Sequence, residues 1–343
     1  AANNLFADLL FRIVRYAGNN EFSFIYINEF SFADILVFYF FISFFFFVYK
    51  FFRSAFSRFA LMILILLNIY TFSLLDNKVY FPSEILTITA IDVGQGDAFL
   101  VKFPNGQTAL IDAGNANEYF DSGKRIKTLL QKFDIDKIDF GFVSHIDADH
   151  YGGFITLIKE NLVETIIKPS ADTSSEKEKD FELFLQKNNV SYLNYNQMIL
   201  KFPNARLYSL INPASESFRG FDSNNRSGII KICFGKTSFL FTGDAEFEAE
   251  EELIHNYKDF IKSDLLKVGH HGSKKASSAY FLNQVKPKYA LISAGYMNQF
   301  KHPSKAVLNR LAAEDIKILR TDLNGAIIIQ STGEKINFIK WKN

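Results

Sequence analysis

Histidines and aspartates concentrate in one short stretch of this chain, HIDADH, which runs from His145 to His150. Only six histidines occur among the 343 residues, and two of them stand here. Imidazole and carboxylate groups together suit zinc, and manganese is a second option. The alternating spacing would let His145, Asp147, Asp149 and His150 serve two neighbouring metal ions. The other interpretation is an Asp-rich turn that caps the following helix and leaves both histidines on the surface.

Three further apolar runs, each predicted to be a strand, also end in loops with residues that could do chemistry. FLFTGDAE ends at Asp244, LLKVGHHGS ends at His270 and His271, and LISAGYMNQFKHPS leads to His302. With the strand KIDFGFVSH before the first cluster, four strand ends hold five of the six histidines, and His255 lies within a predicted helix. Loops at strand ends can aim several side chains at one point, so the pattern predicts a metal centre.

The composition excludes other kinds of site. The single cysteine, Cys233, lies in an apolar segment and is expected in the core, so there is neither a disulfide framework nor a cysteine-based zinc site. Any metal must then be held by histidine and carboxylate. The 38 basic residues nearly balance the 37 acidic ones, so the net charge of +1 indicates no bulk preference for nucleic acid or membrane.

Many of the 39 phenylalanines lie near the N-terminus, in two long apolar runs. Residues 30–49 carry one charge and residues 59–75 carry none, and about 20 apolar residues suffice to cross a bilayer. We therefore predict a membrane segment over residues 1–80 with two transmembrane helices, about 30–49 and 59–75; the alternative is a pair of buried core helices. The short loop from Lys50 to Arg58 is basic, which predicts a cytoplasmic loop and an extracytoplasmic domain after the hairpin.

Residues 76–84 form a polar, proline-containing connector, and the character of the sequence changes after them. Short β-rich runs alternate with amphipathic helical stretches from there to the C-terminus. This alternation predicts one layered domain of the α/β (α+β) class over residues 81–343. The chain begins without methionine and without the pattern of a signal peptide, so we expect a piece of a longer membrane protein.

Six motifs in order give this domain a family resemblance: DVGQGDAFLV, LIDAG, SHIDADHYGG, NNRSGIIKICFGKTSFLFTGDAE, LLKVGHHGS and HPS. Together they resemble the C-terminal domain of the ComEC-type competence DNA-uptake proteins, which belongs to the metallo-β-lactamase superfamily. The resemblance covers roughly residues 85–341. It implies a metallo-β-lactamase-like αββα sandwich preceded by a transmembrane helical hairpin, the end of a channel whose remaining part this chain lacks.

The resemblance also implies two divalent metal ions, zinc or manganese, and six ligands for them. The superfamily usually supplies one more histidine between its first motif and the bridging aspartate, but none occurs from Tyr151 to Asp244. The first ion would then have one ligand fewer. The residues carried over as ligands are His145 and Asp147 for the first ion, Asp149, His150 and His270 for the second, and Asp244 as the bridge between them.

Catalytic roles follow from this ligand set. Two such ions would share a hydroxide, lower its pKa towards neutrality and aim it at phosphorus. Asp149 and Asp244 would orient the attacking water. His271 and Ser273 are candidates to bind the phosphate or to protonate the leaving oxygen, although simple hydrogen bonding within the loop explains them equally well.

Further residues are candidates around the centre. His302, Lys274 and Asn225 are candidates for substrate binding, with alternative roles in capping a helix, on a solvated basic face and in ordering a loop. Lys267 and Lys275 flank the GHHGS motif and could also meet a DNA backbone. Two carboxylates are expected to orient the metal ligands rather than to catalyse, namely Asp97 and Asp112.

The predicted function is that of a metal-dependent phosphodiesterase in a DNA-uptake protein. It would degrade DNA at the outer face of the bacterial inner (plasma) membrane while one strand is transported. Its implied partners are DNA, as duplex or single-stranded product, the membrane, and other competence proteins. Two alternatives stay open: an inactive domain that docks DNA or a partner, and a hydrolase of another phosphoester, such as a phosphorylcholine ester.

Overall fold

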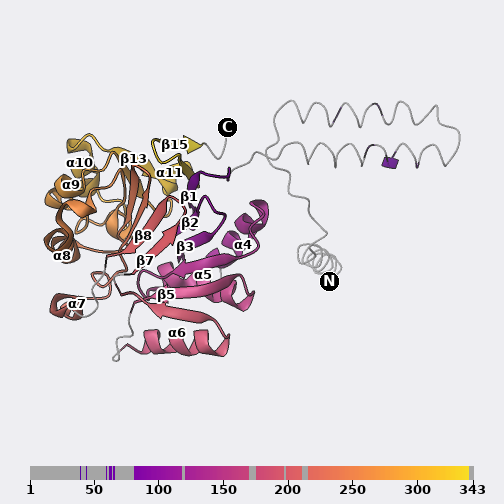
Figure 1. Ribbon diagram of the computed structural model, residues 1–343, viewed down its shortest axis with the longest axis horizontal. Coiled ribbons are helices and arrows are strands. Elements are labelled where there is room, and N and C mark those ends of the chain that lie inside the picture. Colours follow the sequence, from indigo (N-terminus) through magenta and orange to yellow (C-terminus); the bar gives the residue numbers. More distant parts are fainter. Residues whose placement is uncertain are drawn as a thin grey trace, which may run out of the picture. The chain divides into compact units, whose positions relative to one another are not determined.

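The computed structural model describes residues 81–117, 120–169, 175–196, 198–210 and 215–339, and six helical residues nearer the N-terminus: Tyr39, Phe44, Phe59, Met62, Ile63 and Ile65. Phe81–Trp341 form one compact unit (Figure 1). Apart from those six residues, the predicted membrane spans at 30–49 and 59–75 lie outside the described residues. Within the described part of the chain, no helix is both long and apolar enough to span a bilayer.

The first of two sheets has eight strands. Its central hairpin pairs β1 with β2 antiparallel, as the glycine-containing VGQGD turn predicts, and the strands from β3 to β6 pair in parallel. The order across the sheet is β15 (Ile336–Ile339), β14 (Ile327–Ser331), β1 (Leu86–Ala90), β2 (Ala98–Lys102), β3 (Thr108–Ala113), β4 (Ile138–Phe142), β5 (Val163–Lys168) and β6 (Ser191–Asn194).

The second sheet has seven strands, antiparallel from β7 to β10 and parallel from β10 to β13. Cys233, expected in the core, lies on β9 and is half-buried. The order across the sheet is β13 (Lys317–Arg320), β12 (Tyr289–Ile292), β11 (Leu265–Lys267), β10 (Thr237–Phe241), β9 (Ile230–Phe234), β8 (Ala205–Ser209) and β7 (Ile199–Phe202).

Parallel strands require crossover connections, and helices supply them on the outer face of each sheet. The first sheet carries α4 (Ser122–Lys132), α5 (Ala148–Lys159) and α6 (Glu176–Lys187). The parallel half of the second sheet is crossed by α8 (Phe247–Tyr257), α9 (Ala279–Val285) and α10 (Lys305–Ala313). Shorter turns are α7 (Glu216–Gly220), η1 (Lys258–Ile261), η2 (Gly269–Gly272) and α11 (Thr321–Asn324).

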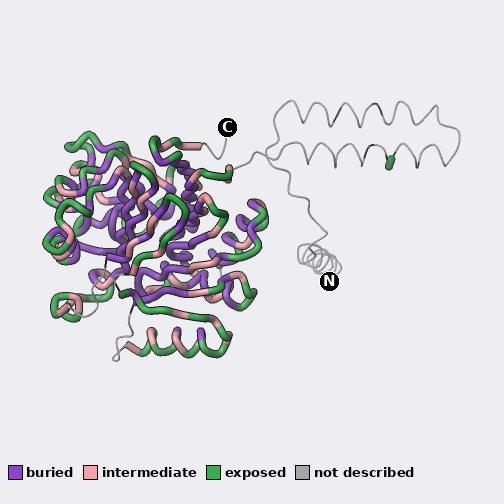
Figure 2. Tube along the Cα trace, viewed as in Figure 1, coloured by how far each residue is buried: buried purple, intermediate pink, exposed green. Residues whose placement is uncertain are grey.

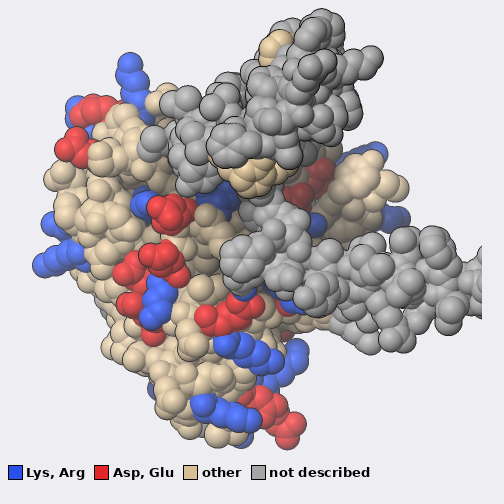
Figure 3. Space-filling view, turned by 90° about the vertical axis from the view of Figure 1, so that its right-hand side faces the viewer, with Lys and Arg blue, Asp and Glu red and all other residues tan. Residues whose placement is uncertain are grey.

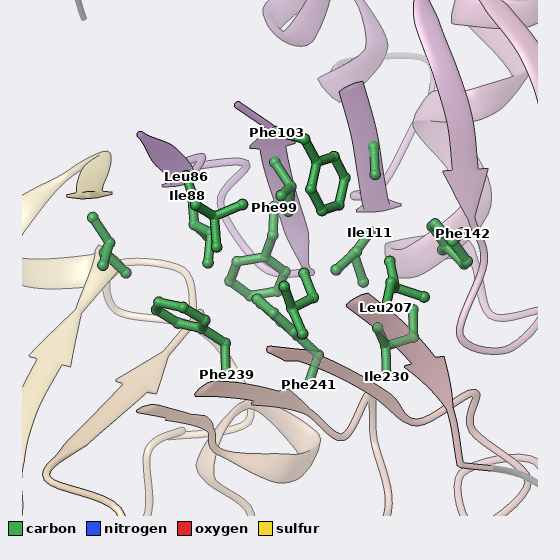
Figure 4. Packing of buried hydrophobic residues seen from close by; sticks show 14 of the residues in the cluster. Leu86, Ile88, Phe99, Phe103, Ile111, Phe142, Leu207, Ile230, Phe239 and Phe241 are labelled. Carbon is green, nitrogen blue, oxygen red and sulfur yellow. The ribbon is translucent and has the colours of Figure 1, made fainter. Parts of the chain in front are cut away.

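The main core lies between the two sheets (Figure 4). Phe99 of β2 meets Phe241 of β10 with ring centroids 5.3 Å apart, and Phe103 stacks on Phe202 at 3.7 Å. A second core fills the space between the second sheet and its helices, where Leu266 is fully buried. The buried strands and more exposed helices give four layers (Figure 2), which confirms the αββα sandwich that the motifs imply.

Figure 3 shows charged side chains of both signs on one outer face of the molecule. On the face in Figure 3, the basic and acidic side chains of the described residues are interspersed, in keeping with the net charge of +1. His255, expected within a helix, lies on α8 and is exposed. The helix α9 begins at Ala279, because the Ser278 hydroxyl accepts from the Phe281 N–H.

Candidate metal centre

Loops from both sheets meet in one buried cluster of imidazoles and carboxylates. His145 follows β4 of the first sheet, and the helix α5 then begins with Asp147 at its N-cap. Asp244 follows β10 of the second sheet. The Nε2 atom of His150 lies 3.3 Å from Oδ1 of Asp244, so the ends of these two strands converge across the sandwich as the sequence predicted.

The first candidate ligand set is His145, His150 and Asp244, all buried. Each offers one ligand atom, and these atoms all lie within 4.8 Å of one another. The two imidazole rings are 4.1 Å apart between centroids. Asp147 lies at the edge of this set, with its Oδ2 3.4 Å from Nε2 of His145.

The second candidate set is Asp149, His150 and His271, under the same 4.8 Å limit. Nε2 of His271 lies 3.3 Å from Oδ2 of Asp149 and 3.5 Å from Oδ2 of Asp244. The two oxygens of Asp244 therefore face different histidines, Oδ1 towards His150 and Oδ2 towards His271. A carboxylate in that position can bridge two cations.

His271, rather than its neighbour His270, takes part in this convergence. The His271 side chain is 2% exposed, whereas that of His270 is 26% exposed and its Nδ1 lies 2.9 Å from Oε1 of Glu246. Nε2 of His270 is 3.7 Å from Oδ2 of Asp244, so it stands at the rim. Both histidines have φ near +50°, at 46° and 51°, in the short turn η2. Strained backbone of this kind is found where a site requires particular side-chain directions.

Several buried polar atoms of the cluster lack hydrogen-bond partners, which is expected where a metal ion binds. Nε2 of His145, Nε2 of His150, Nε2 of His271 and Oδ1 of Asp244 have no such partner among the described residues. Unsatisfied buried polar atoms are costly, and here they belong to the same convergent sets. Imidazole nitrogens and carboxylate oxygens are donors for zinc and manganese, so the residues present fit a divalent ion.

Hydrogen bonds from behind the ligands fix their orientation. Nδ1 of His150 lies 2.9 Å from Oδ2 of Asp112, and the Ser144 hydroxyl donates to the same oxygen at 2.8 Å. Nδ1 of His271 lies 3.0 Å from the carbonyl oxygen of Ser293. In both rings Nδ1 is therefore engaged from behind and Nε2 faces the centre, which is a common arrangement around bound metals. The sequence predicted the orienting role of Asp112 but gave no signal for Ser144 or Ser293.

Lys267 was a candidate to meet the DNA backbone, and that interpretation is wrong. Its side chain is 1% exposed and forms an ion pair with Asp97, whose side chain is fully buried. Lys267 Nζ also donates to the carbonyl oxygen of Gly243 at 2.6 Å and lies 3.6 Å from Oδ1 of Asp244. A lysine this deep cannot reach DNA, and it instead neutralises part of the carboxylate charge of the centre.

The buried charges shift one another's pKa values. Burial alone would lower the pKa of His271, but Asp244 and Asp97 outweigh it and raise that pKa to about 10. Burial would raise the pKa of Asp97, but Lys267 and His271 lower it to about 2. The close approach of the His145 imidazole lowers the pKa of Asp147 to about 2. Without a metal, therefore, the acids are ionised and His271 carries a proton.

The remaining predicted substrate residues lie around this cluster. Asn225 orders a loop, because its Oδ1 accepts from the N–H groups of Glu246 at 2.9 Å and Ala249 at 3.3 Å, at the start of α8. Ser273 is buried, with its hydroxyl accepting from the Lys275 N–H, while the side chain of Lys274 is exposed.

His302 stands at the rim beside His270, with their ring centroids 5.7 Å apart. Its Nδ1 is buried and has no hydrogen-bond partner among the described residues. Burial lowers the pKa of His302, and the nearby His270 and His271 lower it further. The ring is therefore a neutral imidazole next to the centre.

Ser227 was not singled out from the sequence, yet it lies in the region where the superfamily's additional histidine is expected. Its hydroxyl accepts from the Asp244 N–H at 3.0 Å and lies 3.4 Å from Nδ1 of His145. It supports two candidate ligands from behind. A serine gives no distinctive sequence signal for that role.

The fold and this cluster define the class of protein. A model of the metallo-beta-lactamase superfamily matches residues 91–296, more than half of the chain. The chain therefore belongs to the metallo-beta-lactamase superfamily. Among solved structures, CmlA, a diiron beta-hydroxylase from Streptomyces venezuelae, is 13% identical, with a TM-score of 0.47, covering 75% of this chain and 55% of that one. A likeness at that level carries no functional argument.

Curated relatives narrow the family further. The chain is similar to ComE operon protein 3 of Bacillus subtilis, with 32% identity over 254 residues, and to competence protein ComA of Neisseria gonorrhoeae, with 31% identity over 246 residues. The matches cover 70% and 72% of this chain but only 32% of either relative, so the chain spans about a third of their length. They confirm the resemblance to ComEC-type competence proteins.

Proposed function

We propose that this chain carries the metal-dependent phosphodiesterase of a DNA-uptake protein. The observation that carries the proposal is the convergence of two ligand sets, buried except for Asp149, on the two oxygens of Asp244. Zinc and manganese are the ions that these donors favour. When bound, two divalent cations lower the pKa of an attacking water and neutralise charge on the phosphate oxygens.

The candidate ligands can be assigned to the two ions. His145 and Asp147 would hold one ion and Asp149 and His271 the other, with Asp244 between them. His150 is a member of both sets, but its single free Nε2 can ligate only one ion. Lys267 pairs with Asp97 behind these ligands, so this carboxylate adds no net negative charge to a centre that must accept a polyanionic substrate.

Residues at the rim are suited to the leaving group. His270 and His302 are partly exposed and lie side by side at the edge of the centre. Neutral His302 would donate a hydrogen bond to a phosphate or ester oxygen, and His270 would supply a proton to the departing oxygen. Lys274, exposed on the same loop, would contact a neighbouring phosphate as a point charge.

DNA as substrate is supported by the competence-protein relatives and by the six ordered motifs. We place the domain outside the bacterial inner membrane, anchored by the apolar hairpin at about 30–49 and 59–75, with other competence proteins as further partners. The basic loop between those two runs supports this orientation.

The test uses the whole 343-residue chain. Metal per chain is counted by mass spectrometry, and cleavage of labelled DNA is followed with zinc or manganese. Asp149→Ala and Asp244→Ala are expected to lose bound metal and to slow cleavage by at least about 100-fold. The matched control is Asp259→Ala, because the Asp259 side chain is 84% exposed and lies on a surface turn.

A second function follows from the missing histidine between Tyr151 and Asp244. With one donor fewer, the first set would hold its ion weakly, and the domain would dock DNA without cleaving it. A folded chain that binds DNA but neither retains metal nor cleaves any DNA would favour docking. Faster hydrolysis of a phosphorylcholine ester than of DNA would favour a different phosphoesterase.

A further inference from the structure

One loop beside the candidate centre exposes large apolar side chains to solvent. Between β12 and α10, Tyr296 is 73% exposed, Met297 is 84% exposed and Phe300 is 56% exposed. We call residues 295–302 the aromatic arm. Single exposed apolar residues are normal, but three on one short loop next to a candidate active site indicate a binding surface.

The aromatic arm is braced by its own hydrogen bonds. The side-chain amide of Asn298 donates to the carbonyl oxygens of Gly295 at 2.9 Å and His302 at 2.6 Å. The N–H of His302 donates back to Oδ1 of Asn298 at 3.0 Å. One asparagine therefore ties both ends of the loop together, so the exposed side chains are held out in a fixed arrangement.

Both ends of the arm are attached to loops that carry the centre. The N–H of Gly295 donates to Oε1 of Gln95, two residues before Asp97, at 3.2 Å. Just after the arm, the N–H of Ser304 donates to the carbonyl oxygen of Gly272, which follows His271, at 2.8 Å. The arm thus rises from the rim of the cluster.

A line of rings connects the arm to the candidate ligands. Phe300 stacks on His302, with centroids 6.1 Å apart and planes inclined by 17°. The His302 ring is 5.7 Å from that of His270, whose Nε2 is 3.7 Å from Oδ2 of Asp244. This series of contacts therefore leads from Phe300 to the edge of the candidate metal centre.

The charges around the arm are complementary to a phosphate backbone. Lys301 and Lys305 are exposed at and just beyond its end. Lys274 and Lys275 are exposed on the adjoining loop, and the latter also lies 3.6 Å from Oε2 of Glu246. Exposed rings next to lysines are the combination by which proteins hold single strands, since every base has a face that can stack.

We propose that the aromatic arm selects single-stranded DNA by stacking an unpaired base on Phe300, with Tyr296 as a second platform. The proposal rests on the phosphodiesterase function proposed above and names the form of DNA that its site accepts. Bases in a duplex are already stacked on one another and cannot lie on a protein ring without being unpaired. The arm is a positioning device, because it holds the strand while the ligands act on its phosphate.

The test measures binding apart from catalysis. The fluorescence anisotropy of a labelled oligothymidylate is titrated with the whole chain in the presence of a chelator. Phe300→Ala is expected to raise Kd roughly tenfold or more, and Phe300→Trp to leave it unchanged or lower it. Phe300→Leu keeps the apolar character without the ring and should resemble the alanine variant. The control is Leu183→Ala, which removes an equally exposed apolar side chain, 61% exposed, from α6.

Several results would overturn the proposal. Unchanged Kd in both Phe300→Ala and Tyr296→Ala would mean that the arm covers a protein segment instead of a base. An equal loss of affinity for a hairpin duplex would remove the selection for unpaired bases. With metal present, the arm variants should raise KM for the oligonucleotide and leave kcat within about twofold, whereas a fall in kcat alone would contradict positioning.

The experiments distinguish an error in the proposal for the aromatic arm from an error in the proposed phosphodiesterase function. If Phe300→Ala cleaves single strands with wild-type KM, the arm proposal is wrong and the enzyme stands. If the chain binds oligothymidylate through Phe300 but retains no metal and cleaves nothing, the arm stands and the enzyme does not.

Discussion

The ammonium of Lys267 lies against the carboxylate of Asp97 inside the candidate metal centre, and neither side chain is more than 1% exposed. Two opposite charges taken out of water stabilise a fold only when each remains paired, so this pair is a point at which the domain is vulnerable. The pair also joins the two sheets, because Asp97 precedes β2 and Lys267 ends β11.

Removing the lysine should therefore destabilise the domain. Lys267→Met is expected to lower the free energy of unfolding by about 3–5 kcal/mol, since it removes the lysine partner of a fully buried carboxylate. Urea denaturation in the presence of a chelator measures this. Lys288→Met is the control, because its ion pair with Asp264 is exposed on the lysine side and contributes about 1 kcal/mol at most. A double variant that also carries Asp97→Asn should recover part of the loss; no recovery would contradict the pairing.

The two adjacent histidines of η2 should differ in their effect on metal binding. His271→Ala is expected to weaken zinc binding by more than about 100-fold, because its Nε2 faces both Asp149 and Asp244. His270→Ala should weaken it far less, since Nδ1 of that ring is engaged by Glu246 and Nε2 lies at the rim. Competition with a zinc-sensitive dye gives both affinities. The reverse order would restore the ligand assignment made from the sequence.

Removing a hydrogen bond behind a ligand should also weaken metal binding. Asp112→Asn is expected to lower the zinc affinity by about 10–100-fold, because Asp112 orients His150 through Nδ1. The same dye competition measures it. Asp139→Asn serves as the comparison, since that carboxylate accepts from Thr108 away from the centre. An unchanged affinity in Asp112→Asn would mean that His150 does not ligate an ion.

The stability of the domain should fall between about pH 5 and pH 7 because of Glu250. Burial raises its pKa from 4.5 to about 7, although the N–H groups of Ser277 and Ser278 donate to its carboxylate. Between those two values the unfolded chain has lost the proton that the folded chain keeps, so unfolding is favoured as pH rises, by up to about 3 kcal/mol.

The comparison of wild type with Glu250→Gln isolates this effect. Glutamine does not titrate, so the difference in unfolding free energy between the two proteins should change from pH 5 to pH 7.5, in favour of the variant at the higher pH. Urea denaturation at both pH values checks it. A difference that is the same at both pH values would show that the carboxyl group has an ordinary pKa in the folded state.

The turn before Asp97 requires glycine at position 96. Gly96 has φ of +137°, and a Cβ there would lie 2.4 Å from the backbone oxygen of Asp149. Gly96→Ala is expected to destabilise the domain by about 3 kcal/mol or more and to displace the N-terminus of α5. Gly106→Ala separates strain from collision, because φ is +88° with no atom within 4 Å of the new Cβ, so it should cost about 1–2 kcal/mol. Equal losses in the two variants would contradict the collision.

The sequence by itself determined the order of the elements and the residue types of the site. Apolar runs that end in HIDADH, GDAE and GHHGS predicted strand ends that carry ligands, because burial of a strand leaves only its terminal loop free to hold polar groups. The six ordered motifs predicted the superfamily, and the αββα sandwich confirms the fold class.

Only the tertiary structure decided which atoms meet. The sequence could not distinguish His270 from His271, because the positive φ angles of both residues belong to the folded turn η2, whose end residues Gly269 and Gly272 lie close to Ala245 and Pro303. It predicted Lys267 on a basic surface, because a lysine at a strand end is ordinarily solvated; burial beside Asp97 depends on a residue 170 positions earlier. Local sequence patterns fix periodicity and residue type, whereas pairings over such separations are set by how the two sheets pack.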